Sequence, residues 1–110
     1  MNELVERLSK GDHPVIVNRG DQDVQDLKQR IDNGFVLIKF TATQGGTELG
    51  VSLDKDETNL TGADFNAGTG MMHLVGNLTL NYVRVRCIAD IDLATKEGKG
   101  HLEIIEEVSP

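Results

Sequence analysis

Apolar and polar residues alternate along residues 70–93, the longest stretch of the chain with the pattern of a β-strand. Successive side chains of a strand point to opposite faces, so alternation indicates one buried face and one face in solvent. From position 83 the odd residues are apolar and the even ones mostly polar or charged: Val83, Val85, Cys87, Ala89, Ile91 and Leu93 against Tyr82, Arg84, Arg86, Ile88, Asp90 and Asp92. This pattern is typical of an antiparallel sheet covered on one side.

The first half of the same stretch has the opposite phase, since its apolar residues stand at even positions: Met72, Leu74, Leu78 and Leu80. A strand cannot keep one face in the core through a shift of one residue. The shift predicts either a bulge or turn near Asn81 and Tyr82, or a hairpin at Gly76 and Asn77. We favour a bend within one nearly continuous strand.

Helical spacing of apolar residues predicts two helices, one over residues 2–10 and one that begins at Asp21 and ends at Asn33 and Gly34. Their apolar positions are Leu4, Val5 and Leu8 in the first, and Val24, Leu27 and Ile31 in the second. Asp21 is suited to cap the second helix. A helix with one narrow apolar stripe packs on a neighbouring layer, here most simply the sheet.

Shorter apolar segments predict further strands. Residues 15–17 form a brief buried strand, and residues 35–43 begin with four apolar residues, which indicates burial on both sides near the start. Turn-forming residues 44–46 join this strand to residues 47–54, whose alternation is clean. We therefore expect a β-hairpin over residues 35–54.

The rest of the chain predicts a long loop over residues 55–69, a turn over residues 94–100 and a last strand over residues 101–108. Helices concentrated at one end and strands at the other indicate an α+β fold. We expect a mostly antiparallel sheet of about five or six strands, with one or two helices packed on one face, in a single domain of residues 1–110. The alternative is a small half-open β-barrel with a helix.

Composition and charge narrow the classes of function. Hydrophobic residues make up 38% of the chain and the mean hydropathy is −0.27, as in ordinary soluble globular proteins. Eleven basic against 18 acidic side chains give a formal net charge of −7, which disfavours nucleic-acid binding because that depends on cationic groups. The chain lacks an apolar run of about 18 residues, so we expect no association with membranes.

The single cysteine, Cys87, cannot form an internal disulfide and suits a reducing compartment. Together with an N-terminus unlike a secretory signal, this predicts a cytoplasmic location. Cys87 falls on the apolar face of its strand, where a buried thiol is expected. The histidines His13, His73 and His101 lack the spacing of zinc ligands, and the sequence has no catalytic-triad or phosphate-loop motif. We therefore predict no cofactor. The same absence disfavours an enzyme without excluding one.

The polar face of the long strand is the first candidate site: Tyr82, Arg84, Arg86, Asp90 and Asp92. Residues two apart on a strand lie roughly 6.5–7 Å apart on one side. Two arginines in line are suited to hold a carboxylate or phosphate, and paired aspartates are suited to acid–base roles. A solvated face with cross-strand ion pairs accounts for the same pattern without a ligand.

The acidic loop is the second candidate, since its oxygen-bearing side chains are of the kind that bind calcium: Asp54, Asp56, Glu57, Asn59 and Asp64. The spacing departs from the EF-hand pattern, which requires a glycine at the sixth position and a glutamate at the twelfth. Counted from Asp54, those positions hold Asn59 and Phe65. A solvated charged loop is the competing interpretation.

Three hypotheses of function follow. We favour a small acidic cytoplasmic non-catalytic module that binds a protein partner or self-associates as a homo-oligomer, in an accessory, inhibitory or regulatory role, with residues 101–108 as the edge strand in contact. The alternative is a small-ligand (anion) binding domain or enzyme that uses the Arg84, Arg86, Asp90 and Asp92 face beneath the loop of residues 55–69. A second alternative is calcium binding by the acidic loop of residues 54–64.

Overall fold

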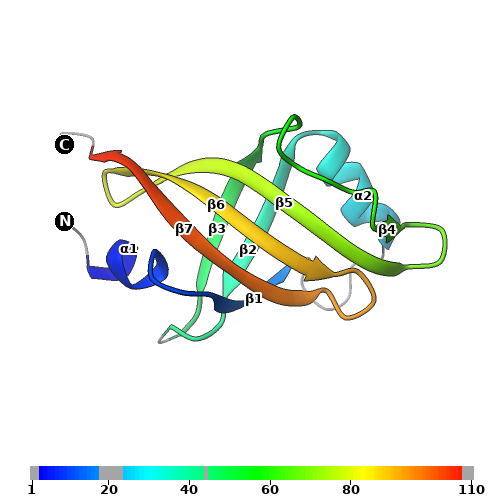
Figure 1. The fold of residues 1–110 in the computed structure, drawn as a ribbon, viewed down its shortest axis with the longest axis horizontal. Coiled ribbons are helices and arrows are strands. Elements are labelled where there is room, and N and C mark those ends of the chain that lie inside the picture. The colour runs from blue at the N-terminus through cyan, green and yellow to red at the C-terminus, as the bar shows by residue number, and fades with distance from the viewer. Residues whose placement is uncertain (1–2, 18–23, 44, 108–110) are drawn as a thin grey trace.

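A computed structural model describes residues 3–17, 24–43 and 45–107 (Figure 1). Two short helices and seven strands follow in this order: α1 (Glu3–Leu8), β1 (His13–Val17), α2 (Val24–Asp32), β2 (Phe35–Phe40), β3 (Thr47–Leu53), β4 (Ala63–Asp64), β5 (Thr69–Leu80), β6 (Val83–Asp92) and β7 (Glu97–Glu107). Neither helix is long and apolar enough to span a membrane, among the residues described.

Six of the strands close into an antiparallel barrel. The order is β3-β2-β1-β7-β6-β5, and β3 pairs again with β5 to complete the circle, while β4 pairs only with the outer edge of β5. Closure rests on two residue pairs, Ser52 with Asn77 and Leu53 with Gly76. A side chain at Gly76 would come within 2.5 Å of the Ser52 carbonyl oxygen, so the glycine allows the two strands to approach.

The interior of the barrel is filled by aliphatic side chains from every barrel strand, and both helices contribute to the same core. Val5 and Leu8 of α1 and Leu27 and Ile31 of α2 are buried. Figure 1 shows α1 and α2 on opposite sides of the barrel. The antiparallel pairing confirms the mostly antiparallel prediction, but the α+β sheet with helices packed on one face is wrong. The alternative, a half-open β-barrel, comes nearer to the structure, in which the barrel is closed. Alternation reports one buried face, and here the sheet covers that face by curling around it.

The long strand stretch is a hairpin, so the bend that we favoured within one continuous strand is wrong. Leu80 of β5 pairs with Val83 of β6 across a two-residue turn, in which Asn81 has a φ of 50° and Tyr82 a φ of 66°. Left-handed residues at both central positions are the requirement of the tightest hairpin turns. Because the chain reverses there, even residues of β5 and odd residues of β6 face the same core.

Several boundaries also differ from the sequence-based expectations. Phe35 is exposed at the start of β2, so this strand is buried on one side rather than two. The last strand begins at Glu97, within the predicted turn, and the predicted loop of residues 55–69 contains β4. The β2–β3 hairpin and the burial of Cys87 are confirmed. The predicted cap Asp21 and the predicted turn residue Gln44 lie outside the described residues.

Candidate functional site

The charged residues predicted from the long strand stretch lie on the outer face of β6. Its burial pattern alternates from Val83 to Asp92, with Val83, Val85, Cys87, Ala89 and Ile91 inside the barrel. Arg84, Arg86, Asp90 and Asp92 therefore project outward, as the alternation predicted. Tyr82 does not share this face, because it belongs to the β5–β6 turn, where its side chain is 61% exposed.

The two arginines each have a carboxylate nearby, from opposite sides of β6. Arg84 Nη1 donates to Glu106 Oε1 of β7 at 2.8 Å, and Arg86 Nη2 lies 4.0 Å from Asp54 Oδ2, which follows β3. The pairs point to different neighbours and do not converge. Arg84 and Glu106 form the cross-strand pair expected of a solvated sheet face, and an exposed pair of this kind stabilises the fold by roughly 0–1 kcal/mol.

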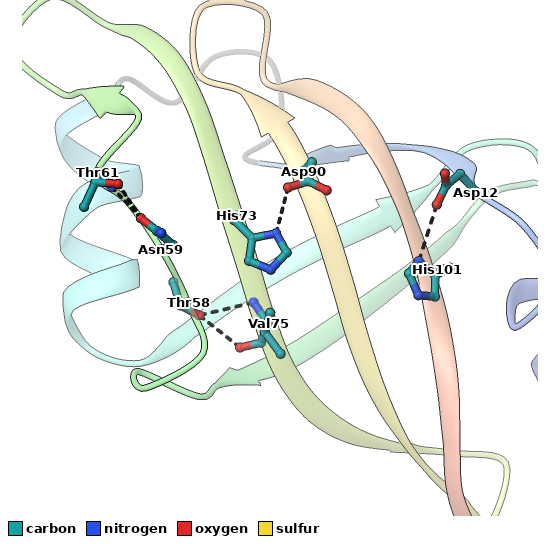
Figure 2. Close-up of polar contacts among 8 residues, drawn as sticks. All are labelled: Asp12, Thr58, Asn59, Thr61, His73, Val75, Asp90 and His101. Atoms are coloured by element: carbon teal, nitrogen blue, oxygen red, sulfur yellow. Dashed lines mark hydrogen bonds and ion pairs between the residues drawn. The ribbon is translucent and has the colours of Figure 1, made fainter.

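The two aspartates also have separate partners. Asp90 Oδ1 lies 2.7 Å from His73 Nδ1 on the neighbouring strand β5, as Figure 2 shows. Asp92 Oδ1 accepts a hydrogen bond from the Ala94 amide at 2.8 Å and so holds the turn after β6. The geometry thus divides the four charged residues of β6 among four local contacts.

A shallow groove of about 600 Å³ lies over the outer faces of β6 and β7. Its lining includes Asp90 and Asp92 but neither arginine, together with Ile88, Lys99 and His101. The loop of residues 55–69 contributes none of the lining residues. That loop runs along the edge of β5, where Asn59 bridges to His73 and the Thr58 hydroxyl both donates to the Val75 carbonyl and accepts from its amide (Figure 2).

The oxygen-bearing side chains of the acidic loop hold the turns of the loop itself. Asp54 Oδ1 accepts from the Asp56 amide at 3.0 Å, and Asp64 Oδ1 accepts from the Asn66 amide at 2.9 Å. Asn59 Oδ1 accepts from both the amide and the hydroxyl of Thr61 (Figure 2). Within the described ranges, no group of three or more His, Cys, Asp or Glu side chains is arranged to hold a metal ion.

The other reactive side chains are also engaged or buried. Burial raises the pKa of the Cys87 thiol to about 12, which disfavours the nucleophilic thiolate. His13 Nε2 lies 2.9 Å from the carbonyl oxygens of Arg7 and Lys10, so it ties α1 to β1. His101 lies between two carboxylates, with Nδ1 3.4 Å from Asp12 and Nε2 3.9 Å from Glu103.

The second half of β7 has an open backbone edge. β7 pairs with β6 along its whole length, but β1 covers its other edge only from Glu97 to Gly100. In the part of the chain that the structure describes, no strand pairs with that other edge from His101 to Glu107. A groove of about 370 Å³ runs beside this edge, between residues 9–12 and residues 101–104.

Exposed apolar side chains lie at this end of β7. Ile104 is 38% exposed and Ile105 is 51% exposed. The exposed Tyr82 lies nearby, just beyond the Val83–Glu107 pair, at the end of the three-stranded ribbon formed by β5, β6 and β7. A register shift between Arg84 and Val85 leaves Ile105 as the unpaired residue of a β-bulge. We call His101–Glu107 with the adjoining groove the open edge.

Comparisons with known proteins add no family to this picture. No protein-family model matches the chain, and no curated protein matches its sequence significantly.

Proposed function

We propose that this chain is a protein-binding module and that an extended segment of its partner adds to the open edge of β7. One observation carries the proposal: β7 continues for seven residues, His101–Glu107, beyond the last residue pair with β1. Unpaired N–H and C=O groups along a strand edge are a template for another strand. Strand addition of this kind supplies backbone hydrogen bonds for affinity and side-chain contacts for specificity.

The position of the open edge supports the proposal. The 370 Å³ groove beside residues 101–104 lies where β1 would continue if it were longer. Ile104 and Ile105 place exposed apolar surface along the same edge, which a bound segment would remove from water. Natural proteins usually blunt such edges, and β7 does so in part, through Glu103, Glu106 and Glu107 and through the bulge at Ile105.

Binding through this edge is tested with two matched substitutions, Ile105→Lys and Met71→Lys. Both replace exposed apolar side chains, 51% and 48% exposed, and Met71 lies at the opposite end of the β5–β6–β7 ribbon. Substitutions at such exposed sites change stability by roughly 0.5 kcal/mol or less. We expect wild type and M71K to retain the same partner and I105K to lose it, with slowed amide exchange at residues 101–107 in the complex. Equal retention by all three proteins, or protection elsewhere, contradicts the proposal.

The groove over β6 and β7 supports a second candidate function, the binding of a small polar ligand. It holds Asp90 and Asp92 of the predicted face, beside Lys99 and His101. The separate pairing of Arg84 and Arg86 makes an anion the less suitable ligand. Chemical-shift changes confined to Ile88, Asp90 and Lys99 in a small-molecule screen would favour this candidate over strand addition.

A further inference from the structure

We infer that the segment that joins the open edge is a strand of another protein with basic side chains at alternate positions, and not a second copy of this chain. The inference rests on the proposed strand addition and adds the chemistry of the partner. It follows from the direction in which the chain leaves β1, from the charges along β7 and from the sequence of β7 itself.

The chain before β1 stops pairing with β7 and forms the other wall of the groove, while α1 contacts β7 beyond it. His13 pairs with Gly100, and this is the last pair between the two strands. Gly11, with a φ of 71°, lies in the connection to α1, and the contacts of His13 Nε2 with Arg7 and Lys10 hold that connection in place. A segment that entered the groove would continue the line of β1 beside residues 101–104.

The walls of this groove are acidic. Glu103 projects from the outer face of β7, since its cross-strand neighbour Arg86 is on the outer face of β6. Asp12 lies on the opposite wall, and Figure 2 shows its contact with His101 of β7. The two arginines of β6 are engaged with other carboxylates, since Arg84 pairs with Glu106 and Arg86 lies 4.0 Å from Asp54. Glu103 contacts His101 Nε2 at 3.9 Å and lines the groove. Charged groups directly opposite one another on paired strands stabilise the pairing when their signs differ.

The other face of the same edge is apolar. Leu102 is buried in the core, and Ile104 pairs with the buried Val85 while remaining 38% exposed. Side chains of an added strand alternate between the two faces, because successive residues point to opposite sides. A segment that alternates basic and apolar residues therefore matches Glu103 on one face and Ile104 on the other.

A second copy of the chain is a poor match for the same edge. Residues 101–107 read HLEIIEE and contain three glutamates but no lysine or arginine. An antiparallel self-pairing centred on Ile104 places Glu106 opposite Leu102, Glu103 opposite Ile105 and Glu107 opposite His101, so no glutamate meets a lysine or arginine. Two such strands bring six glutamates together in chains that each carry a formal net charge of −7. Like charges on neighbouring strands destabilise the pair.

Three blocked seven-residue peptides test the inference on the full chain. The first alternates lysine with valine, the second alternates glutamate with valine, and the third is the lysine peptide with N-methyl groups on alternate backbone nitrogens. Binding is followed by chemical-shift changes of the protein amides at residues 101–107. We expect the lysine peptide to bind there, the glutamate peptide not to bind, and the N-methylated peptide to bind much more weakly because it lacks half of its backbone donors.

Charge variants of the protein sharpen the result. The double variant Glu103→Gln and Glu106→Gln is compared with Asp56→Asn and Glu57→Gln, which removes two charges from the exposed loop after β3. Glu106 already pairs with Arg84, so the edge variant removes one ion pair to the peptide, at Glu103. An exposed ion pair contributes about 0.2–1 kcal/mol, so the edge variant should weaken lysine-peptide binding roughly 1.4- to fivefold. The loop variant should leave the affinity unchanged, since strands β5 and β6 stand between β3 and β7 on that side of the barrel and salt screens exposed charges at such separations.

The outcomes separate this inference from the proposed function. Equal binding of the lysine and glutamate peptides at residues 101–107 overturns the basic partner and leaves strand addition standing. Binding of the N-methylated peptide as tightly as its parent, or binding of no peptide, also overturns the inference. A dimer in light scattering that Ile105→Lys disrupts shows that a second copy takes the edge. The proposed function itself fails if I105K retains the partner of the wild type, or if the partner protects amides outside residues 101–107.

Discussion

Closure of the barrel depends on Gly76, and replacing it with alanine tests this part of the fold. The two pairs between β3 and β5 are the only strand pairing that closes the circle among the described residues. A β-carbon at position 76 would lie 2.5 Å from the Ser52 carbonyl oxygen and in the space of the Val51 side chain. Since both neighbours belong to the paired strand, β3 and β5 must separate to admit it.

Two opposing effects determine how far Gly76→Ala lowers the free energy of unfolding. Forcing an extra carbon into a packed site costs about 1–3 kcal/mol. Alanine restricts the unfolded chain more than glycine, which returns about 0.4–1 kcal/mol. We therefore expect Gly76→Ala to lower the free energy of unfolding by roughly 1–2 kcal/mol, with the larger part of the cost concentrated at the β3–β5 pairing.

Urea unfolding and amide exchange together measure this effect. Gly62→Ala is the matched control, because a β-carbon there meets its nearest atom, the Met71 carbonyl oxygen, at 3.2 Å. The control should lose less stability than G76A, and only G76A should exchange its amides at residues 52–53 and 76–77 faster. A G76A protein as stable as the control, with those amides still protected, would refute the proposed closure.

Two further predictions concern residues away from the open edge. Tyr82→Gly should raise the free energy of unfolding by roughly 0.5–1 kcal/mol in urea titrations, because Tyr82 holds a φ of 66° that glycine adopts without strain. A loss of stability would show that the exposed ring contributes contacts of its own. Cys87 should resist thiol reagents in the folded protein. Its burial should also make stability fall as the pH rises above the ordinary thiol pKa of 9.0, because the unfolded thiol ionises there while the pKa of the folded one is about 12. Cys87→Ala should remove this part of the pH dependence, and an unchanged dependence would contradict the prediction.

The sequence predicts local structure well where one face of a strand is buried. Alternation identified the inward residues of β6 from Val83 to Ile91, and Leu49 and Val51 as inward residues of β3. It also located the change of phase at Asn81 and Tyr82. The interpretation of that change was wrong because a bulge and a two-residue hairpin both shift the phase by one residue, and Tyr82 is not a usual residue at positive φ.

The closure of the barrel could not be predicted from the same pattern. A strand that faces a helix layer and a strand that faces the opposite wall of a barrel both show one apolar side. The decisive feature is the close approach of β3 and β5 at Gly76. A single glycine within a strand is equally typical of a bulge or a bend, so its presence does not predict that approach.

The candidate site was predicted in part. Alternation identified the outward charges of β6. Residues 101–108 were predicted as an edge because their two faces are less clearly polar, and β1 leaves one edge of β7 uncovered from His101 to Glu107. It could not show that Glu106, Asp54 and His73 would meet those charges, since each comes from a distant segment. The groove beside His101 depends on the turn before β1, which no pattern in the sequence specifies.

Amide hydrogen exchange along β7 in the free protein tests the central claim most directly. The account predicts that about half of the amides of residues 101–107, those that point away from β6, exchange rapidly, because alternate residues of a strand donate to opposite sides. Amides of residues 97–100 should exchange slowly, since β1 and β6 cover both edges there. Slow exchange throughout residues 101–107 in the free monomer would show that the edge is already covered, and would contradict the account.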